Sequence, residues 1–271
     1  MDKPHRLGVT EGPFRVDQLR EGDRYELSGG HPLWCAPTGG SGARGSVSGA
    51  EVLDSAPDVD STGIDAGFAL DDKTLRAPDV AVGNVPDAPG WIRGVPPLAV
   101  EYASTGQDEA DLQTKIAELL DRGTRWVWVV RLVGPRRVEV HERDRPLRLV
   151  GPGEELRAPG VLRNPVPIEA LFDRAVAHKV TLRNLLQREG YDGIEAVREA
   201  GREAGREEGR EEGRQEGRAE GRAEALVEAV ESLCLALDIP LSSERRAGLT
   251  TLDVAGLREL LTRLRTARRW D

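Results

Sequence analysis

The chain has 271 residues and a formal net charge of −9, with 38% hydrophobic and 31% charged residues. These values predict a water-soluble protein with one substantial domain and an appendage, and they argue against a protein that coats nucleic acid non-specifically. No run of about 18 apolar residues predicts a membrane helix, and the charged N-terminal residues lack the apolar segment of a signal peptide. Cys35 and Cys234 stand in unrelated contexts, so we expect a reducing, cytoplasmic setting without a disulfide framework.

The first 75 residues are rich in Gly, Asp and Ser and show few clear periods. Residues 16–22 predict a short helical turn. Residues 24–37 predict a strand, a glycine turn and a second strand, and residues 48–56 favour a helix.

The hydrophobic pattern is sharper from Arg76 onward. Apolar and β-branched runs predict strands at 76–83, 97–104, 125–132 and 138–143, with two further short strands in 146–162. Residues 108–123 predict a helix that begins with acidic residues and ends at Gly123, and residues 166–190 predict another. Strands that alternate with helices indicate an α/β fold, with a central mixed sheet flanked by helices.

Residues 198–224 repeat the unit Gly-Arg-Glu-Xaa, with a glycine at every fourth position. Arg and Glu at i,i+3 stabilise a helix by roughly 0.2–0.5 kcal/mol per pair, whereas each interior glycine costs about 1 kcal/mol relative to alanine. A period of four also drifts about 40° per repeat around a helix of 3.6 residues per turn. We therefore expect a solvated, frayed helical spacer. A repeat with little functional demand and an oligomerising stalk both remain open.

The end of the chain regains a core pattern. A coiled-coil-like stripe and a last helix capped by Asp253 predict a small helical module. The apolar positions are Leu226, Val230, Leu233 and Leu237, followed by Leu257, Leu260, Leu261 and Leu264. The module could pack on itself, on the main domain, or on a second copy in a homo-oligomer. We thus divide the chain into a main domain at 1–175, a helical spacer at 176–225 and a C-terminal module at 226–271.

Two acids near strand ends and one lysine on the following helix form the strongest chemical pattern. Asp79 and Glu101 lie in consecutive strands that are close enough to pair, and adjacent strands are about 4.8 Å apart. Mg²⁺ prefers such carboxylate ligands, and Lys115 could return a cation to them from the helix. The alternatives are a plain surface pair between Asp111 and Lys115, and a structural role for Asp79 at the start of its strand.

A basic segment lies further along the chain. Residues 122–148 contain eight arginines and only three acids. This segment could face a phosphate backbone, or it could be a solvated hairpin face.

The chain resembles the Uma-two family of putative restriction endonucleases, within the PD-(D/E)XK nuclease superfamily, over roughly residues 14–173. The spacing Glu101, Ser104, Asp111, Lys115 matches the family pattern. Further matches are Tyr25-Glu26-Leu27, Gly30, Pro78-Asp79, Gly123, Trp128 and "VPIEALF". The resemblance implies a restriction-endonuclease-like fold and a DNA substrate. It also implies Mg²⁺, or alternatively Mn²⁺, held by Asp79 and Glu101, with Lys115 assisting the water and Glu26 in support.

Three features depart from the patterns of the family and superfamily. Ala103 stands where the superfamily usually has a lysine, and Arg131 stands where the family often has an acid. The segment 39–53 has no histidine, which the family often carries there. Two functions follow. One is a metal-dependent DNA endonuclease, and the other is a catalytically impaired nuclease fold that binds nucleic acid or another protein. Metal-dependent cleavage distinguishes them.

Overall fold

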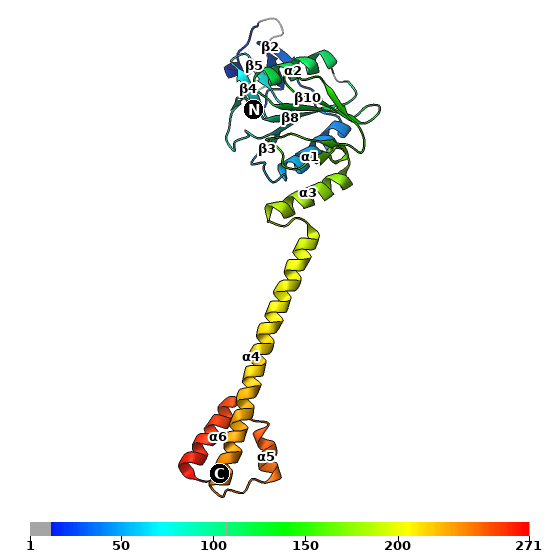
Figure 1. Cartoon of the computed structure of the whole chain (residues 1–271). Coiled ribbons are helices and arrows are strands. Elements are labelled where there is room, and N and C mark those ends of the chain that lie inside the picture. The colour runs from blue at the N-terminus through cyan, green and yellow to red at the C-terminus, as the bar shows by residue number, and fades with distance from the viewer. Residues whose placement is uncertain (1–11, 107, 271) are drawn as a thin grey trace. The chain divides into compact units, whose positions relative to one another are not determined.

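The computed structural model describes residues 12–106 and 108–270, and Figure 1 shows their helices and strands. The chain divides into two compact units, Met1–Ile194 and Glu195–Asp271. The first unit combines mixed sheets with helices, so the predicted α/β class is confirmed. No helix in the described part of the chain is long and apolar enough to cross a membrane.

A six-stranded sheet forms the centre of the first unit, in the order β11-β10-β9-β8-β6-β3. Its strands are β3 (Thr62–Ile64), β6 (Val80–Val82), β8 (Leu98–Ala103), β9 (Trp126–Arg131), β10 (Arg137–His141) and β11 (Arg148–Val150). Strands β8 and β9 are parallel, and the other neighbours are antiparallel. Every residue of β8 is buried, as expected for a strand whose sheet is covered on both faces.

A five-stranded sheet contains the N-terminal hairpin, in the order β2-β1-β5-β4-β7. Its strands are β1 (Tyr25–Ser28), β2 (His31–Trp34), β4 (Phe68–Asp71), β5 (Thr74–Arg76) and β7 (Ile92–Arg93). The predicted strand-turn-strand at 24–37 is confirmed as β1 and β2, and the turn η1 (Val16–Gln18) precedes it. Strands β12 (Glu155–Leu156) and β13 (Val166–Pro167) form a separate two-stranded ribbon.

Helices cover the two faces of the six-stranded sheet (Figure 1). On one face, α1 (Gly40–Asp54), η2 (Ile168–Leu171) and α3 (Arg174–Arg188) share a core with Val100 and Trp128 of the sheet. On the other face, α2 (Glu109–Asp121) packs through Leu112, Ile116 and Leu119 against small and β-branched residues. This second core also contains Phe68 of the five-stranded sheet. Alternation along β8 therefore sends successive side chains to different layers.

Helix α1 begins at Gly40, although sequence pattern favoured a helix only from residue 48. Glycines weaken a helix on their own, but here two of them allow close approach to β8. A Cβ at Gly45 would lie 2.6 Å from the ring of Tyr102, and one at Gly49 would lie 2.1 Å from its hydroxyl oxygen. The Tyr102 hydroxyl donates to the Leu171 carbonyl at 3.0 Å. Tertiary packing thus fixes a helix that propensity alone would not extend.

The prediction of one helix over 166–190 is wrong. Val166 and Pro167 pair with β12, η2 follows, and α3 starts only at Arg174. Asp173 caps α3 by accepting from the N–H groups of Ala175 and Val176, at 2.8 and 3.2 Å. A capping acid inside the segment starts a new helix after the 3-10 turn.

The far end of α3 is bonded to the end of α1. The buried Asn184 side chain donates to the Val52 carbonyl at 3.2 Å. The Arg188 guanidinium donates to four carbonyls that follow or end α1, those of Asp54, Ser55, Ala56 and Val59. An arginine that satisfies the last carbonyls of a helix stabilises that end. Helix α3 is therefore an integral part of the first unit.

The second unit consists of α4 (Ile194–Ala236) from Glu195 onward, α5 (Ser243–Leu249) and α6 (Val254–Ala267). The Gly-Arg-Glu repeat is helical, and residues 198–222 are exposed, in agreement with the absence of an apolar face. The end of α4 contributes Val230 and Cys234 to a core with α5 and α6. The predicted cap is confirmed, since Asp253 accepts from the Gly256 N–H at 2.8 Å.

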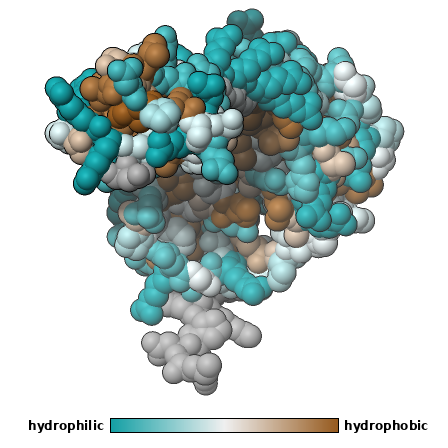
Figure 2. Space-filling model, turned by 90° about the horizontal axis from the view of Figure 1, so that it is seen from below, coloured by the Kyte–Doolittle hydropathy of each residue, from teal (hydrophilic) through white to brown (hydrophobic). Residues whose placement is uncertain are grey.

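The surface seen in Figure 2 is mostly hydrophilic, with hydrophobic residues in smaller groups. The most exposed large hydrophobic side chains come from separate elements, such as Trp34 in β2, Leu149 in β11 and Leu235 in α4. Single exposed apolar residues are normal on protein surfaces. They do not by themselves mark a site.

Candidate active site

Glu101 lies near the end of β8, on the face of the sheet that α2 covers. Its neighbours on that face, Ala99 and Ala103, are small and buried. Asp108 caps α2 by accepting from the Asp111 N–H at 3.1 Å, which fixes where the helix starts. Lys115, six residues into the helix, is thereby directed back toward the strand.

The Lys115 ammonium is enclosed by three oxygen atoms. It lies 2.9 Å from a carboxylate oxygen of Glu101 and 3.2 Å from one of Glu26. It also donates to the Ala77 carbonyl at 2.7 Å. These three partners match the three donors of a lysine ammonium. The interpretation of Lys115 as a surface partner of Asp111 is wrong, because Lys115 is buried and pairs across the layers.

The electrostatics of this pair follow from burial and neighbouring charge. Burial alone would lower the pKa of Lys115, but Glu101, Glu26 and Asp79 raise that pKa above its usual value. Burial raises the pKa of Glu101 to about 8; Lys115 opposes the shift, while Asp79 and Glu26 reinforce it. The raised pKa favours the protonated form of Lys115. This form suits the orientation of groups and the stabilisation of negative charge rather than general-base catalysis.

Asp79 immediately precedes β6, which is the antiparallel neighbour of β8. Because Val80 pairs with Val100, Asp79 lies level with Glu101 on the adjacent strand. One Asp79 oxygen accepts from the Tyr102 N–H at 2.6 Å. Burial raises the pKa of Asp79, and this bond and Lys115 counteract the rise. Asp79, Glu101 and Lys115 all line one cavity of about 380 Å³.

Arg76 belongs to a buried ion-pair network next to this cavity. Sequence reasoning missed this residue. Its side chain is fully buried, and it donates to Glu118 at 2.5 Å and to Glu26 at 3.0 Å, with Asp111 at 3.4 Å. Glu26 also accepts from the Ala77 N–H at 3.3 Å. Glu26 thus connects Arg76 to Lys115. An arginine at the beginning of the apolar strand predicted at 76–83 was the only signal in the sequence.

A sequence profile of the Uma2 family, described as putative restriction endonuclease, matches residues 14–166. The chain belongs to the Uma2 family. The fold is similar to the crystal structure of a putative nuclease belonging to DUF820 from Anabaena variabilis, with a TM-score of 0.51 and 17% identity. That likeness covers 61% of this chain and 99% of the other. A comparison with curated proteins gives no match.

Ala103, which departs from the superfamily pattern, and Arg131, which departs from the family pattern, both have structural contacts. Ala103 packs beneath α2 next to Glu101, and it pairs with Arg131 of β9 across the parallel strands. Arg131 donates two bonds of 2.8 Å to Glu109 and one of 2.7 Å to Glu139. The positive charge at this strand end is therefore neutralised by two acids, one in α2 and one in β10. Arg131 does not line the active-site cavity, where Lys115 supplies the positive charge.

The donor set fits a divalent metal of the kind that the Uma2 family implies. Among residues 12–106 and 108–270, no group of three or more His, Cys, Asp and Glu side chains is placed to hold a metal ion. Mg²⁺ needs fewer protein ligands than that, since water and substrate phosphate complete a coordination shell that begins with one or two carboxylates. Asp79 and Glu101 supply two carboxylates on the wall of an open cavity. Oε1 of Glu101 is buried and makes no hydrogen bond with the residues that the structure describes; its contact is the ion pair with Lys115.

Proposed function

We propose that the chain is a nuclease that hydrolyses phosphodiester bonds of DNA with a divalent metal. Mg²⁺ is the expected ion, Mn²⁺ is the alternative, and Asp79 and Glu101 are the proposed ligands. The observation that carries the proposal is a buried lysine ammonium paired with Glu101, beside a second strand-end carboxylate, on the wall of one cavity. Such a combination of perturbed groups in a cleft is typical of catalytic sites.

The proposed roles follow from the contacts. When bound, a divalent ion activates water and offsets charge on the phosphate. Glu101 and Asp79 are held at fixed positions, because Lys115 pairs with one and the Tyr102 N–H bonds the other. A bound cation would favour the ionised form of both carboxyl groups. Lys115 remains protonated, so it stabilises charge that develops on the phosphate. Glu26 supports the ammonium from the opposite side and does not need to touch the substrate.

The test of this proposal is nicking of supercoiled plasmid DNA by the whole protein at low salt, with Mg²⁺, with Mn²⁺ and with EDTA. We expect cleavage only when metal is present. Lys115→Ala should slow cleavage by roughly 10²–10³, the effect of removing one electrostatic stabiliser, while the metal still binds. An RNA substrate run in parallel distinguishes DNA from nucleic acid in general.

The second candidate function is a binding module with an inactive nuclease fold. The observation that favours it is that the Lys115 ammonium already has three oxygen partners within the protein. A protein that binds DNA or RNA but cuts neither with either metal would support this function over the enzyme. Cleavage that proceeds equally well in EDTA would contradict the metal-dependent proposal.

A further inference from the structure

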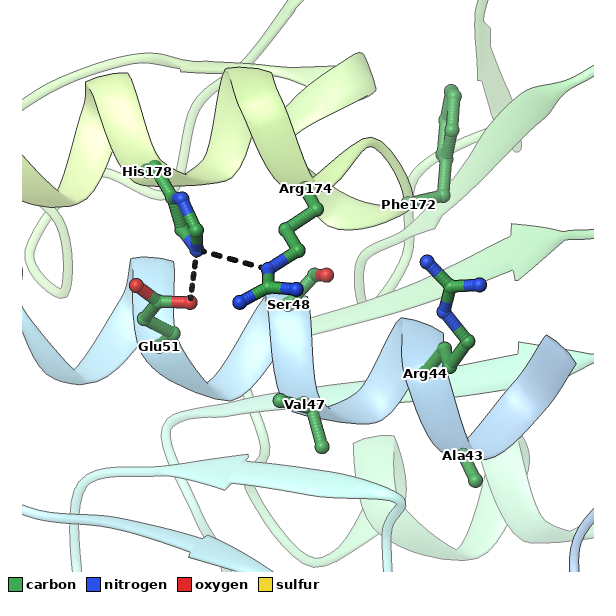
Figure 3. Close-up of a pocket in the computed structure, with 8 residues that line it drawn as sticks. All are labelled: Ala43, Arg44, Val47, Ser48, Glu51, Phe172, Arg174 and His178. Carbon is green, nitrogen blue, oxygen red and sulfur yellow. Dashed lines mark hydrogen bonds and ion pairs between the residues drawn. The ribbon is translucent and has the colours of Figure 1, made fainter. Parts of the chain in front are cut away.

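A second hollow of about 460 Å³ lies on the other face of the six-stranded sheet, between α1 and α3 (Figure 3). Its lining includes Arg44, Ser48 and Glu51 of α1, together with Phe172, Arg174 and His178. None of these residues has a role in the candidate active site. The hollow therefore needs an account of its own.

The hollow carries an excess of positive charge. Figure 3 shows Arg174 extending from α3 toward Ser48, while Arg44 rises from α1 toward Phe172. Within the described part of the chain, Arg44 makes no ion pair or hydrogen bond. Arg174 donates from Nε to Nε2 of His178 at 3.3 Å. Glu51 lies 3.9 Å from His178 and pairs with neither arginine in that same part of the chain.

Two arginines, Arg44 and Arg174, thus line a hollow whose lining contains one carboxylate, Glu51. A third arginine, Arg136, is not part of the lining but contacts one of its members, with its guanidinium 5.4 Å from the centre of the Phe172 ring. Guanidinium groups present a planar fork of donors that matches the oxygens of a phosphate. A phosphate group is therefore the ligand that this lining suits best.

The hollow is preformed and tied to the candidate active site. Arg188 and Asn184 bond α3 to the end of α1, so the two walls do not need to close around a ligand. Gly39, the residue before α1, lines the active-site cavity. Arg44 follows five residues later, about 7.5 Å further along the helix axis. Helix α1 therefore extends from the active-site cavity at Gly39 to the hollow at Arg44.

We propose that Arg44 and Arg174 bind a backbone phosphate of the nucleic acid whose cleaved bond enters the Asp79–Glu101 cavity. This inference rests on the proposed function and adds a second point of attachment for the same substrate. The contact is to the backbone, so it sets the position of the strand without reading its bases.

The test compares two double variants of the whole protein. Arg44→Gln with Arg174→Gln removes the two charges from the hollow. Arg206→Gln with Arg218→Gln removes the same charge from two exposed positions in α4. Binding of a short fluorescent DNA duplex is measured in EDTA across a range of salt concentrations. Melting midpoints establish that all three proteins are folded.

The Arg44/Arg174 variant should bind DNA at least about tenfold more weakly, because charge-assisted bonds to phosphate are about twice as strong as neutral ones. Its plot of log Kd against log salt should be shallower by about 0.9, since the two arginines share one phosphate and the loss of one phosphate contact removes roughly that much slope. The control should keep the slope of the parent. Equal affinity and slope in the two double variants would overturn the inference while leaving the proposed function intact.

Two further outcomes separate the inference from the function on which it rests. If the parent cuts no nucleic acid and binds none, the proposed function and the inference both fail. Inorganic phosphate then serves as a probe. If it raises the melting midpoint of the parent but not of the Arg44/Arg174 variant, the hollow binds a free phosphorylated ligand, which contradicts the assignment to a nucleic-acid backbone.

Discussion

Arginine, lysine and glutamate occur in two opposite surroundings in this chain. Around the candidate site, Arg76 and Lys115 are buried with Glu26 and Glu101, and Arg76 also pairs with the half-buried Glu118. In the repeat of α4, pairs such as Arg202 with Glu199 are exposed on both sides. Water screens the second kind of pair and is excluded from the first. Ion pairs between the same residue types are therefore strong at the candidate site and contribute little to stability in the repeat.

The largest expected effect is on the buried network. Arg76→Ala leaves Glu26, Glu118 and Asp111 without their shared cation, and breaking a buried ion pair costs about 3–5 kcal/mol. The matched change Arg202→Ala on α4 should alter stability by less than about 0.5 kcal/mol, as is usual for exposed positions. Urea unfolding followed by tryptophan fluorescence and circular dichroism measures both. Equal destabilisation by the two substitutions would break the comparison.

The second effect concerns where the folded first unit ends. Truncation after Gly190 removes the repeat and the C-terminal module but keeps α3, so the melting midpoint of the first unit should hardly change. Truncation after Asp173 also removes Asn184 and Arg188, whose bonds to the end of α1 are then lost. That midpoint should fall by several degrees, since roughly 1 kcal/mol shifts the midpoint of a domain of this size by about 2–4 °C. A large loss already at Gly190 would show that the repeat supports the first unit.

The smallest effect is a pH dependence at the rim of the site. Hydrogen bonds from Arg131 lower the pKa of Glu109 to about 2. A carboxylate with a lowered folded-state pKa adds stability above its unfolded pKa, about 4.3, and loses it as the pH falls toward 2. Glu109→Gln should therefore reduce the loss of melting temperature between about pH 5 and pH 3. The control Glu199→Gln in α4 should keep the decline of the parent, and a decline unchanged in Glu109→Gln would contradict the assignment.

Several parts of this account could be predicted from the sequence. The spacing from Glu101 to Lys115 falls within one strand, one loop and one helix, so periodicity and family resemblance placed both residues. The repeat of α4 was also predictable, because its four-residue period excludes a fixed apolar face. These features depend on short distances along the chain.

Other features depend on tertiary contacts that a local pattern cannot contain. Arg76 reaches Glu26, Asp111 and Glu118 across separations of 50, 35 and 42 residues. The early start of helix α1 depends on the packing of Gly45 against Tyr102 of strand β8. The break between η2 and α3 follows from a strand pairing and a cap, both of which interrupt an apparently continuous helical pattern.

The most direct test of the central claim compares acids of the two regions in one cleavage assay. Asp79→Asn and Glu101→Gln remove charge from the proposed metal site, whereas Glu199→Gln removes charge from the repeat. Asp79→Asn keeps a side-chain oxygen that can still accept from the Tyr102 N–H, so we expect all three variants to fold. With Mg²⁺ at low salt, the parent and Glu199→Gln should nick plasmid DNA, and the two site variants should not. A parent that cuts neither DNA nor RNA with Mg²⁺ or Mn²⁺, or a Glu101→Gln variant that cuts as fast as the parent, would contradict the account.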